Sequence, residues 1–292
     1  MKVMVMVKAS NDSEAGQMPS EKMLTKMGEF NQKLVDAGIL VSADGLHPSS
    51  KGARIQFSGS TRAVTDGPFT ETKELLAGYW IWRVKSMDEA IAWVKQCPNP
   101  HEEDCEIEIR QVFDTEDFGD AYTPEIREKN AAIHAQSLGL GAPRFENGRD
   151  LLIAGLNASY TLKTRSGIPA QWQRFAPSFG KVPGQRGLNS YGVCWNNKPD
   201  YTFDYLTGVE VSDASGSTPG FAQVHLPAQR YIVFTHEKPI SEIGDALSTI
   251  WTKWLPDSGL KSAPAPCFER YTEDFNPKTG LGGAEIWVPI QP

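Results

Sequence analysis

The sequence predicts the α+β fold class, with two domains of different design. In the first half, strand-like and helix-like segments follow the order β-α-β-β-α-β, with one small extra hairpin. The second half contains the order strand–helix–strand–strand twice. The chain has 292 residues, which exceeds the roughly 100–200 residues of one typical domain. We therefore expect a mixed domain followed by a duplicated one.

The first half begins with a dense apolar run at residues 2–8, which is typical of a central strand. A helix follows and stops at Gly38, and a capping box at Ser86 opens a second helix that Pro98 closes. This order of elements predicts a ferredoxin-like plan. The strands are expected at 2–8, 53–58, 61–65, 78–84 and 105–112, and the helices between Pro19 and Gly38 and between Ser86 and Pro98.

The second half is internally repetitive, which predicts pseudo-symmetry. Its strands are expected at 151–162, 189–195 and 202–211, then at 228–236, 267–271 and 284–290, with helices at 168–179 and 240–255. Two such units predict one curved antiparallel sheet with helices on one side and a cleft at the seam between the halves. The matched positions are Trp172 and Phe175 with Trp251 and Trp254, Tyr191 with Glu269 or a neighbour, and Glu210 with Glu285.

The boundary between the domains is expected where the composition changes, at residues 119–148. Charged residues dominate the start of this stretch, and glycine and proline dominate its end. We expect domains at 1–118 and 147–292, joined by a linker at 119–146 that contains one helix.

Charge and cysteine usage exclude several classes of function. The net charge of −7 disfavours a nucleic-acid partner, because an acidic chain repels phosphate. The first residues turn polar too quickly for a signal peptide, and no apolar run reaches the about 18 residues of a membrane span. Scattered cysteines at 97, 105, 194 and 267 predict free thiols in a reducing cytoplasm. The run from His101 to Cys105 lacks metal-ligand spacing, so we expect a solvated loop, no metal and no cofactor.

The first half carries a distinctive loop, DGPFTETKE, at residues 66–74. With GLHPSSKGARI (45–55) and GYWIW (78–82), it resembles the DGPF branch of the YciI-related family over residues 1–118. The resemblance implies a dimeric α/β barrel, in which two sheets pack face to face, and hence a homodimer through this domain. The reactive side chains of the signature are His47, Asp66, Glu71 and Lys73.

Two interpretations of the DGPF signature remain open. His47 and Asp66 have the chemistry of a general acid/base pair. Alternatively, Asp66 caps its own turn, while Glu71 and Lys73 are surface or dimer contacts.

The second half contains a series of short motifs in a specific order. They are YGV (191–193), FDYLTGVEV (203–211), YIVFTH (231–236), IWTKWLPDSG (250–259), CFERY (267–271) and EIWVPI (285–290). Together they resemble the GyrI-like small-molecule-binding family, also seen as the effector domain of multidrug-sensing transcription regulators, over residues 147–292. The resemblance implies an aromatic pocket for flat, apolar, often cationic compounds. By motif position, its acidic residue is Glu269.

The residue chemistry suits such a pocket. A carboxylate walled by aromatic rings is partly desolvated and favours a cation, and each ring face adds roughly 0.5–2 kcal/mol. Strand alternation places Glu285 and Trp287 away from the apolar set at 286, 288 and 290, on the side where a pocket is expected. Trp251 and Trp254 also fit a helix core. The candidate ligand-binding residues are Trp172, Tyr191, Trp195, Tyr205, Trp251, Trp254, Glu269, Tyr271 and Trp287.

The sequence is compatible with three functions. We favour binding of a hydrophobic or cationic organic ligand, as a sensor, sequestering or detoxifying protein. The first alternative is a hydrolase of strained, cyclopropane-bearing electrophiles, known among GyrI-like proteins, with Glu269 and Tyr271 as catalytic residues. The second alternative is an enzyme centred on His47 and Asp66, with the second domain as its effector module.

Overall fold

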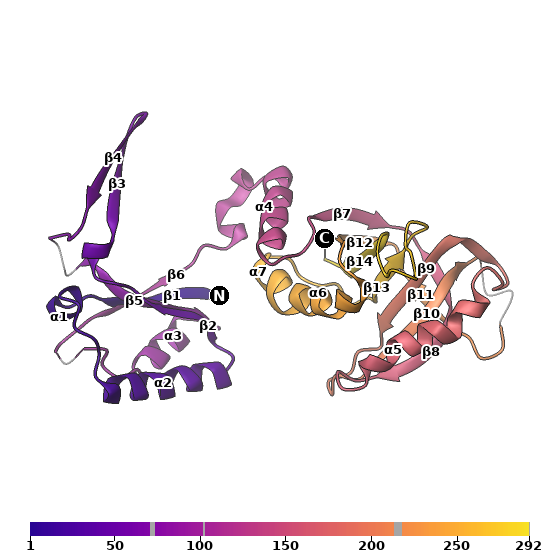
Figure 1. The fold of residues 1–292 in the computed structure, drawn as a ribbon, viewed down its shortest axis with the longest axis horizontal. Coiled ribbons are helices and arrows are strands. Elements are labelled where there is room, and N and C mark those ends of the chain that lie inside the picture. Colours follow the sequence, from indigo (N-terminus) through magenta and orange to yellow (C-terminus); the bar gives the residue numbers. More distant parts are fainter. Residues whose placement is uncertain (71–73, 102, 213–217, 292) are drawn as a thin grey trace. The chain divides into compact units, whose positions relative to one another are not determined.

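The computed structural model describes residues 1–70, 74–101, 103–212 and 218–291 (Figure 1). The chain divides into two compact units, Met1–Asp117 and Phe118–Pro292. Glu71 and Lys73 of the DGPF signature lie outside the described residues. The predicted domain limits at 118 and 147 stay a prediction.

Unit 1 is built on a four-stranded antiparallel sheet in the order β2-β5-β1-β6. Alternation along β1 buries Val3 and Val5 on one face, where they pack with Trp82 of β5 and with Phe30 and Leu34 of α2. Its elements are β1 (Lys2–Lys8), α1 (Asn11–Glu14), α2 (Glu21–Asp36), β2 (Leu40–Gly45), β3 (Ala53–Ser58), β4 (Thr61–Asp66), β5 (Leu76–Arg83), α3 (Met87–Val94) and β6 (Ile107–Gln111).

The ferredoxin-like order of unit 1 is confirmed, with one strand that the sequence analysis missed. That strand is β2, which pairs with β5 at the edge of the sheet. Its residues are mostly exposed, so the apolar signal that marks a central strand is weak there. The predicted hairpin is present as β3 and β4, which form a sheet of their own. The homodimer stays a prediction.

Unit 2 contains an eight-stranded sheet in the order β11-β8-β10-β9-β13-β14-β12-β7, in which all neighbours are antiparallel. Its helices are α4 (Pro124–Ser137), α5 (Ile168–Phe175), α6 (Ile243–Thr249), the π-helical η7 (Ile250–Trp254) and α7 (Leu255–Asp257). Its strands are β7 (Pro143–Gly148), β8 (Leu151–Tyr160), β9 (Gln185–Trp195), β10 (Phe203–Val211), β11 (Ala222–Leu226), β12 (Gln229–His236), β13 (Cys267–Tyr271) and β14 (Ala284–Pro289). The predicted curved antiparallel sheet is confirmed.

This sheet is strongly curled. Leu226 of β11 and Tyr231 of β12 belong to one buried cluster, although these strands stand first and seventh in the sheet order. A flat sheet would hold them roughly 25–30 Å apart. The two-residue connections at 149–150 and 227–228 join opposite regions of the sheet and impose the curl.

The curl gives the sheet two different faces. The inner face carries Tyr191, Phe268 and Trp287, which lie in the buried cluster inside the curl. The helix face carries Ile286 and Val288, which pack beneath the helices. Successive residues of each strand alternate between the two faces.

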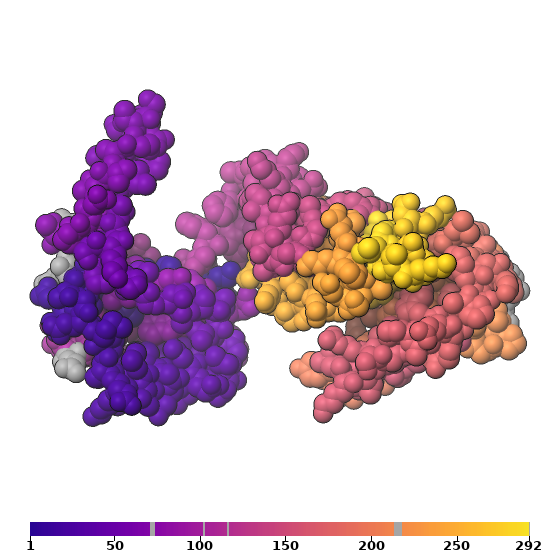
Figure 2. Space-filling model, viewed as in Figure 1, coloured from indigo at the N-terminus to yellow at the C-terminus, as the bar shows by residue number. Residues whose placement is uncertain are grey.

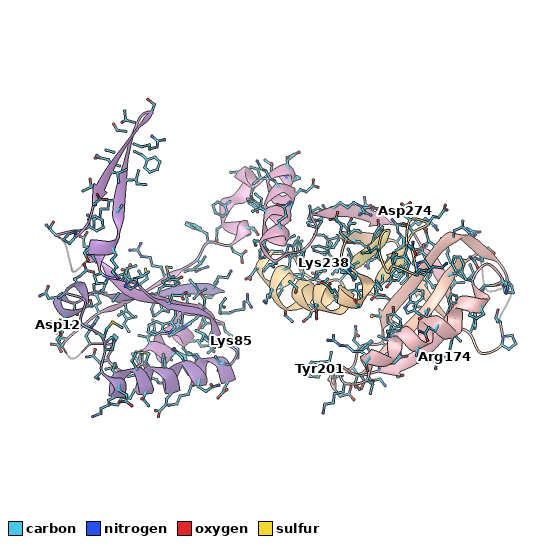
Figure 3. All side chains as sticks on the ribbon, viewed as in Figure 1. Asp12, Lys85, Arg174, Tyr201, Lys238 and Asp274 are labelled. Carbon is cyan, nitrogen blue, oxygen red and sulfur yellow. The ribbon has the colours of Figure 1, made fainter. Side chains whose placement is uncertain are left out.

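The helices cover the helix face in two separate patches (Figure 1). Phe175 of α5 packs on Val209 of β10, while side chains that point away from the sheet, such as Arg174, are exposed (Figure 3). Ile250 and Trp254 of η7 pack on Ile286 and its neighbours. The central strands β9 and β13 therefore lie beneath the seam between the two patches.

Helix α4 lies in the interval predicted as a linker, and it packs within unit 2. Ala135 is fully buried in the same cluster as Trp254, whose indole N–H donates to the Ala131 carbonyl at 3.2 Å. β7 and β11 were not predicted, because they lie at the two edges of the sheet, where few residues are fully buried.

The helices of the described residues are all too short or too polar to traverse the apolar interior of a bilayer.

Two tryptophans in η7 offer a test of the helix-face core. Trp254 is fully buried and packs edge-on against Phe234 at 4.9 Å, whereas Trp251 is 36% exposed. We predict that Trp254→Ala lowers the free energy of unfolding by about 3–5 kcal/mol, because it leaves a cavity. Trp251→Ala, the matched control, costs about 1 kcal/mol or less. Urea denaturation followed by circular dichroism measures both, and equal losses would contradict the assigned packing.

Candidate functional site

A buried carboxylate lies at the middle of the helix face of unit 2. Glu269, on β13, is only 6% exposed. Its Oε2 accepts hydrogen bonds from the hydroxyls of Tyr205, at 2.6 Å, and Tyr271, at 2.8 Å. The indole N–H of Trp172 donates to the Tyr205 hydroxyl at 3.1 Å. One helix and two strands thus supply a connected polar cluster, here called the Glu269 cluster: Trp172, Tyr205, Glu269 and Tyr271.

Strand register explains how these residues meet. Glu269 stands opposite Gly192 of β9, and Tyr205 stands opposite Cys194 of the same strand. A Cβ atom on Gly192 would lie 2.0 Å from the Tyr205 hydroxyl and 2.6 Å from Oε2 of Glu269. The tyrosine reaches across β9 to the carboxylate because position 192 has no side chain.

Aromatic rings surround the carboxylate. Trp172 packs edge-on against Tyr271, with ring centroids 5.0 Å apart. The ring centroids of Phe275 and Tyr271 are 4.8 Å apart. Trp172 and Phe275 are half-buried, so this wall extends to the surface. The surface is hollowed between the pink segment of α5 and the orange segment of α6 (Figure 2).

The electrostatics of the cluster follow from its burial. Burial raises the pKa of Glu269 above its ordinary value, and the two tyrosine hydrogen bonds only partly oppose this shift. Burial and the neighbouring carboxylate raise the pKa of both Tyr205 and Tyr271 well above the ordinary value. Among the described residues, no lysine, arginine or histidine forms an ion pair with Glu269.

Two thiols adjoin the carboxylate, and the sequence analysis gave them no role. Cys194 and Cys267 are directly paired across β9 and β13, on the same face as Glu269. The hydrogen bond with Cys267, together with burial, raises the pKa of Cys194 well above its ordinary value. Cys194 is therefore a neutral thiol, and both cysteines are free and pack beside the acid. Their shared strand parity with Glu269 is the sequence signal that points to them.

The predicted ligand-binding residues divide between the two faces. Tyr191, Trp195 and Trp287 lie on the inner face, opposite the Glu269 cluster. Glu269 stands opposite Ile286, so the neighbouring Trp287 points to the other side of the sheet. The predicted ligand-binding residues therefore do not all face one cleft.

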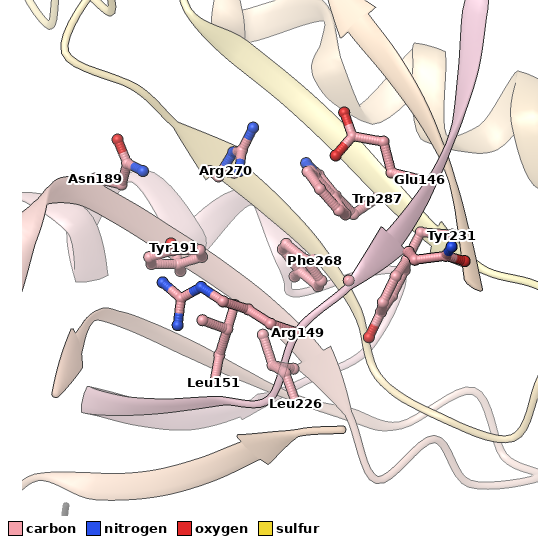
Figure 4. Close-up of a pocket in the computed structure, with 12 residues that line it drawn as sticks. Glu146, Arg149, Leu151, Asn189, Tyr191, Leu226, Tyr231, Phe268, Arg270 and Trp287 are labelled. Carbon is pink, nitrogen blue, oxygen red and sulfur yellow. The ribbon is translucent and has the colours of Figure 1, made fainter. Parts of the chain in front are cut away.

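Two of the three predicted residues on the inner face line a cavity, and the third does not. Tyr191 and Trp287 line a cavity of about 270 Å³ inside the curl (Figure 4). Trp195 packs against the inner cluster and donates to Asn157 at 3.2 Å. Of the helix tryptophans, Trp254 is core, as its helical periodicity allowed, and Trp251 is at the surface.

The described start of the DGPF signature, residues 66–70, forms a turn that packs against Ser49. His47 lines an open cavity of about 340 Å³ together with Glu14 and Ser49, while Asp66 is exposed at the end of β4. No hydrogen bond joins His47 to Asp66 in the described residues. A Cβ atom on Gly67 would lie 1.8 Å from the Ser49 carbonyl oxygen, so glycine is required there.

Ser49 connects this turn to the rest of unit 1. Its hydroxyl accepts from the backbone N–H of Phe69 at 3.1 Å and donates to the Glu14 carboxylate. These contacts favour a structural role for the turn over the acid/base pair.

Gly192 gives a direct test of the Glu269 cluster. We predict that Gly192→Ala lowers the free energy of unfolding by about 1–3 kcal/mol, because the new methyl group displaces the Tyr205 hydroxyl from Glu269. Gly244→Ala, in α6 with no atom within 4 Å of the new methyl group, should raise stability by about 0.5–1 kcal/mol. Urea denaturation compares the two variants. A neutral Gly192→Ala would show that the hydrogen bond does not need this close approach.

Comparison with known proteins places both halves of the chain. The model of the GyrI-like small molecule binding domain matches residues 142–291, and that of the YCII-related domain matches residues 1–116. The transcriptional regulator BrlR of Pseudomonas aeruginosa is 30% identical over 121 residues, which are 41% of this chain and 44% of BrlR. The uncharacterized protein R00369 of Rhizobium meliloti is 31% identical over 92 residues, which are 32% of this chain and 74% of that protein.

Among solved structures, that of SAV2435 bound to tetraphenylphosphonium is similar, with a TM-score of 0.43 and 17% identity. The similarity covers 51% of this chain and 93% of SAV2435. The family match at residues 142–291 includes every strand of the curled sheet. The chain therefore belongs to the GyrI-like small-molecule-binding family, and it carries a YCII-related domain at its N-terminal end.

Proposed function

We propose that unit 2 binds lipophilic aromatic cations, with Glu269 as the counter-charge. One observation supports this proposal above the others. Glu269 is a buried carboxylate that accepts hydrogen bonds from two tyrosine hydroxyls, and no cationic side chain of the described residues pairs with it. The described residues supply no positive charge to this carboxylate, and a positively charged ligand would supply it.

The energetics of the cluster favour such a ligand. An unpaired buried carboxylate is costly, and a cation that reaches it recovers part of the desolvation penalty. The faces of Trp172, Tyr205 and Tyr271 add cation–π attraction of roughly 0.5–2 kcal/mol each. Rings and one acid impose little shape selection, so this site suits a range of aromatic cations. Trp172 is half-buried and is the ring against which an entering ligand stacks.

Hydrolysis is a second candidate function, which the raised pKa of Glu269 favours. Both tyrosine hydrogen bonds go to Oε2, so Oε1 is the oxygen that would take a proton from a water molecule. A hydrolase would form product from a cyclopropane-bearing electrophile and would lose that activity in Glu269→Gln. Continued turnover in the variant would remove Glu269 from the mechanism.

The main test replaces the charge and keeps the shape. We predict that Glu269→Gln weakens tetraphenylphosphonium binding about tenfold or more, because two opposite unit charges about 6–8 Å apart attract each other by about 2–3 kcal/mol at an effective dielectric constant of about 20. Tetraphenylborate, which has the same shape and the opposite charge, should bind the wild-type protein more weakly than the cation. Isothermal titration calorimetry measures both ligands.

The matched control for this test is Glu273→Gln, which removes an exposed carboxylate four residues further along the chain. We expect no change in tetraphenylphosphonium affinity in this variant. If Glu269→Gln binds the cation as well as the wild type does, the proposal fails.

The raised pKa of Glu269 predicts a pH dependence of ligand binding. The cation pairs with the carboxylate and not with the neutral acid. Affinity for tetraphenylphosphonium should therefore fall as the pH drops through the raised pKa and reach a plateau above it. Titrations from about pH 5 to about pH 8 measure this profile. The profile of Glu269→Gln should be flat, and an equal slope in both proteins would contradict the assignment.

A further inference from the structure

The inner face of the curled sheet holds a cavity that is separate from the Glu269 cluster. It has a volume of about 270 Å³ and opens beside the end of β7. Phe268 and Arg270 of β13 line it, whereas Glu269 and Tyr271 of the same strand point to the helix face. The cavity and the Glu269 cluster therefore lie on opposite faces of the same strand.

Four aromatic rings line this cavity (Figure 4). Phe268 stacks on Trp287 with ring centroids 5.2 Å apart and an interplanar angle of 17°. Tyr231 meets both rings edge-on at 5.4 and 5.5 Å, and Tyr191 lies beside Phe268 at 6.1 Å. The volume is at the low end for ligand sites, so a planar compound of one or two rings fits.

The carboxylates on one side of the cavity are already neutralised. Glu285 accepts from Arg144 at 2.7 Å and from Arg270 at 2.7 Å. Arg144 also pairs with Glu146, the carboxylate that lines the cavity.

Arg149 also lines the cavity, and its partner carboxylate, Glu210, is neutralised in the same way. Glu210 accepts two hydrogen bonds from Arg149, at 2.8 and 2.6 Å. A cation that entered the cavity would therefore meet no carboxylate without an arginine among the described residues.

Arg270 has N–H donors that the hydrogen bond to Glu285 does not use. Its Nε donates to Glu285, and its guanidinium group lies 4.6 Å from the ring centroid of Trp287. Its terminal nitrogens donate to no acceptor within the described part of the chain. A guanidinium fork held against an aromatic ring matches the geometry of a carboxylate on a flat ligand.

From this arrangement we propose that the inner cavity binds a small planar aromatic acid, whose ring packs on Phe268 and Trp287 and whose anionic group pairs with Arg270. This site is independent of Glu269 and takes the opposite charge. It goes beyond the proposed function, and either can hold without the other.

The test uses 2-naphthoate as probe, with 2-naphthylmethanol and 2-naphthylmethylammonium as neutral and cationic controls. Calorimetry should rank the acid at least fivefold tighter than the alcohol, with the ammonium weakest. Arg270→Gln keeps a donor for Glu285 but loses the charge, and it should weaken naphthoate binding at least fivefold. Arg186→Gln, at an exposed position of β9, should leave that affinity unchanged.

A second variant keeps the test decisive if Arg270→Gln does not fold. Leu151 lines the cavity and is half-buried, so Leu151→Trp should fill it and abolish naphthoate binding. Glu269→Gln should leave naphthoate affinity unchanged, and tetraphenylphosphonium should not displace naphthoate.

Three outcomes would overturn the proposal. They are equal affinity for acid and alcohol, unchanged naphthoate affinity in Leu151→Trp, or loss of naphthoate binding in Glu269→Gln. Loss of cation binding alone would remove only the proposed function at Glu269.

Discussion

The pairing of β13 with β9 decides what unit 2 can hold on either side of its sheet. Glu269 opposite Gly192 leaves room for the Tyr205 hydroxyl to cross β9 and reach the carboxylate. The same register turns Phe268 and Arg270 to the inner face. A slip of one residue would exchange the two sets, so a polar cluster and an aromatic cavity depend on one alignment.

Carboxylates on the inner face accept hydrogen bonds from arginines, whereas the carboxylate on the helix face accepts them from tyrosines. Glu210 and Glu285, which the internal repeat matches to each other, both accept hydrogen bonds from arginines on neighbouring segments. These carboxylates are satisfied within the protein. Glu269, by contrast, accepts hydrogen bonds from two neutral hydroxyls and pairs with no arginine among the described residues.

The sequence was informative wherever a signal is local. Alternation in EIWVPI correctly placed Ile286 in the core and Trp287 on the opposite side, where a cavity lies. The relation of Glu269 to Trp287 depends on the register between β13 and β14, which no local pattern encodes. The edge strands β2, β7 and β11 were missed because half-exposed residues carry little apolar period. Gly192 was overlooked because a glycine in a strand shows its purpose only when its neighbours across the sheet are known.

The strand order of unit 2 also constrains how the protein is made. β14 is synthesised after every other strand, yet it lies between β13 and β12. Until it emerges from the ribosome, β12 and β7 can pair only with each other, and β13 presents an open edge. The curled sheet is therefore completed late in synthesis, when β14 pairs with β13 and β12. Chaperone protection would matter most during synthesis of the last residues of the sheet.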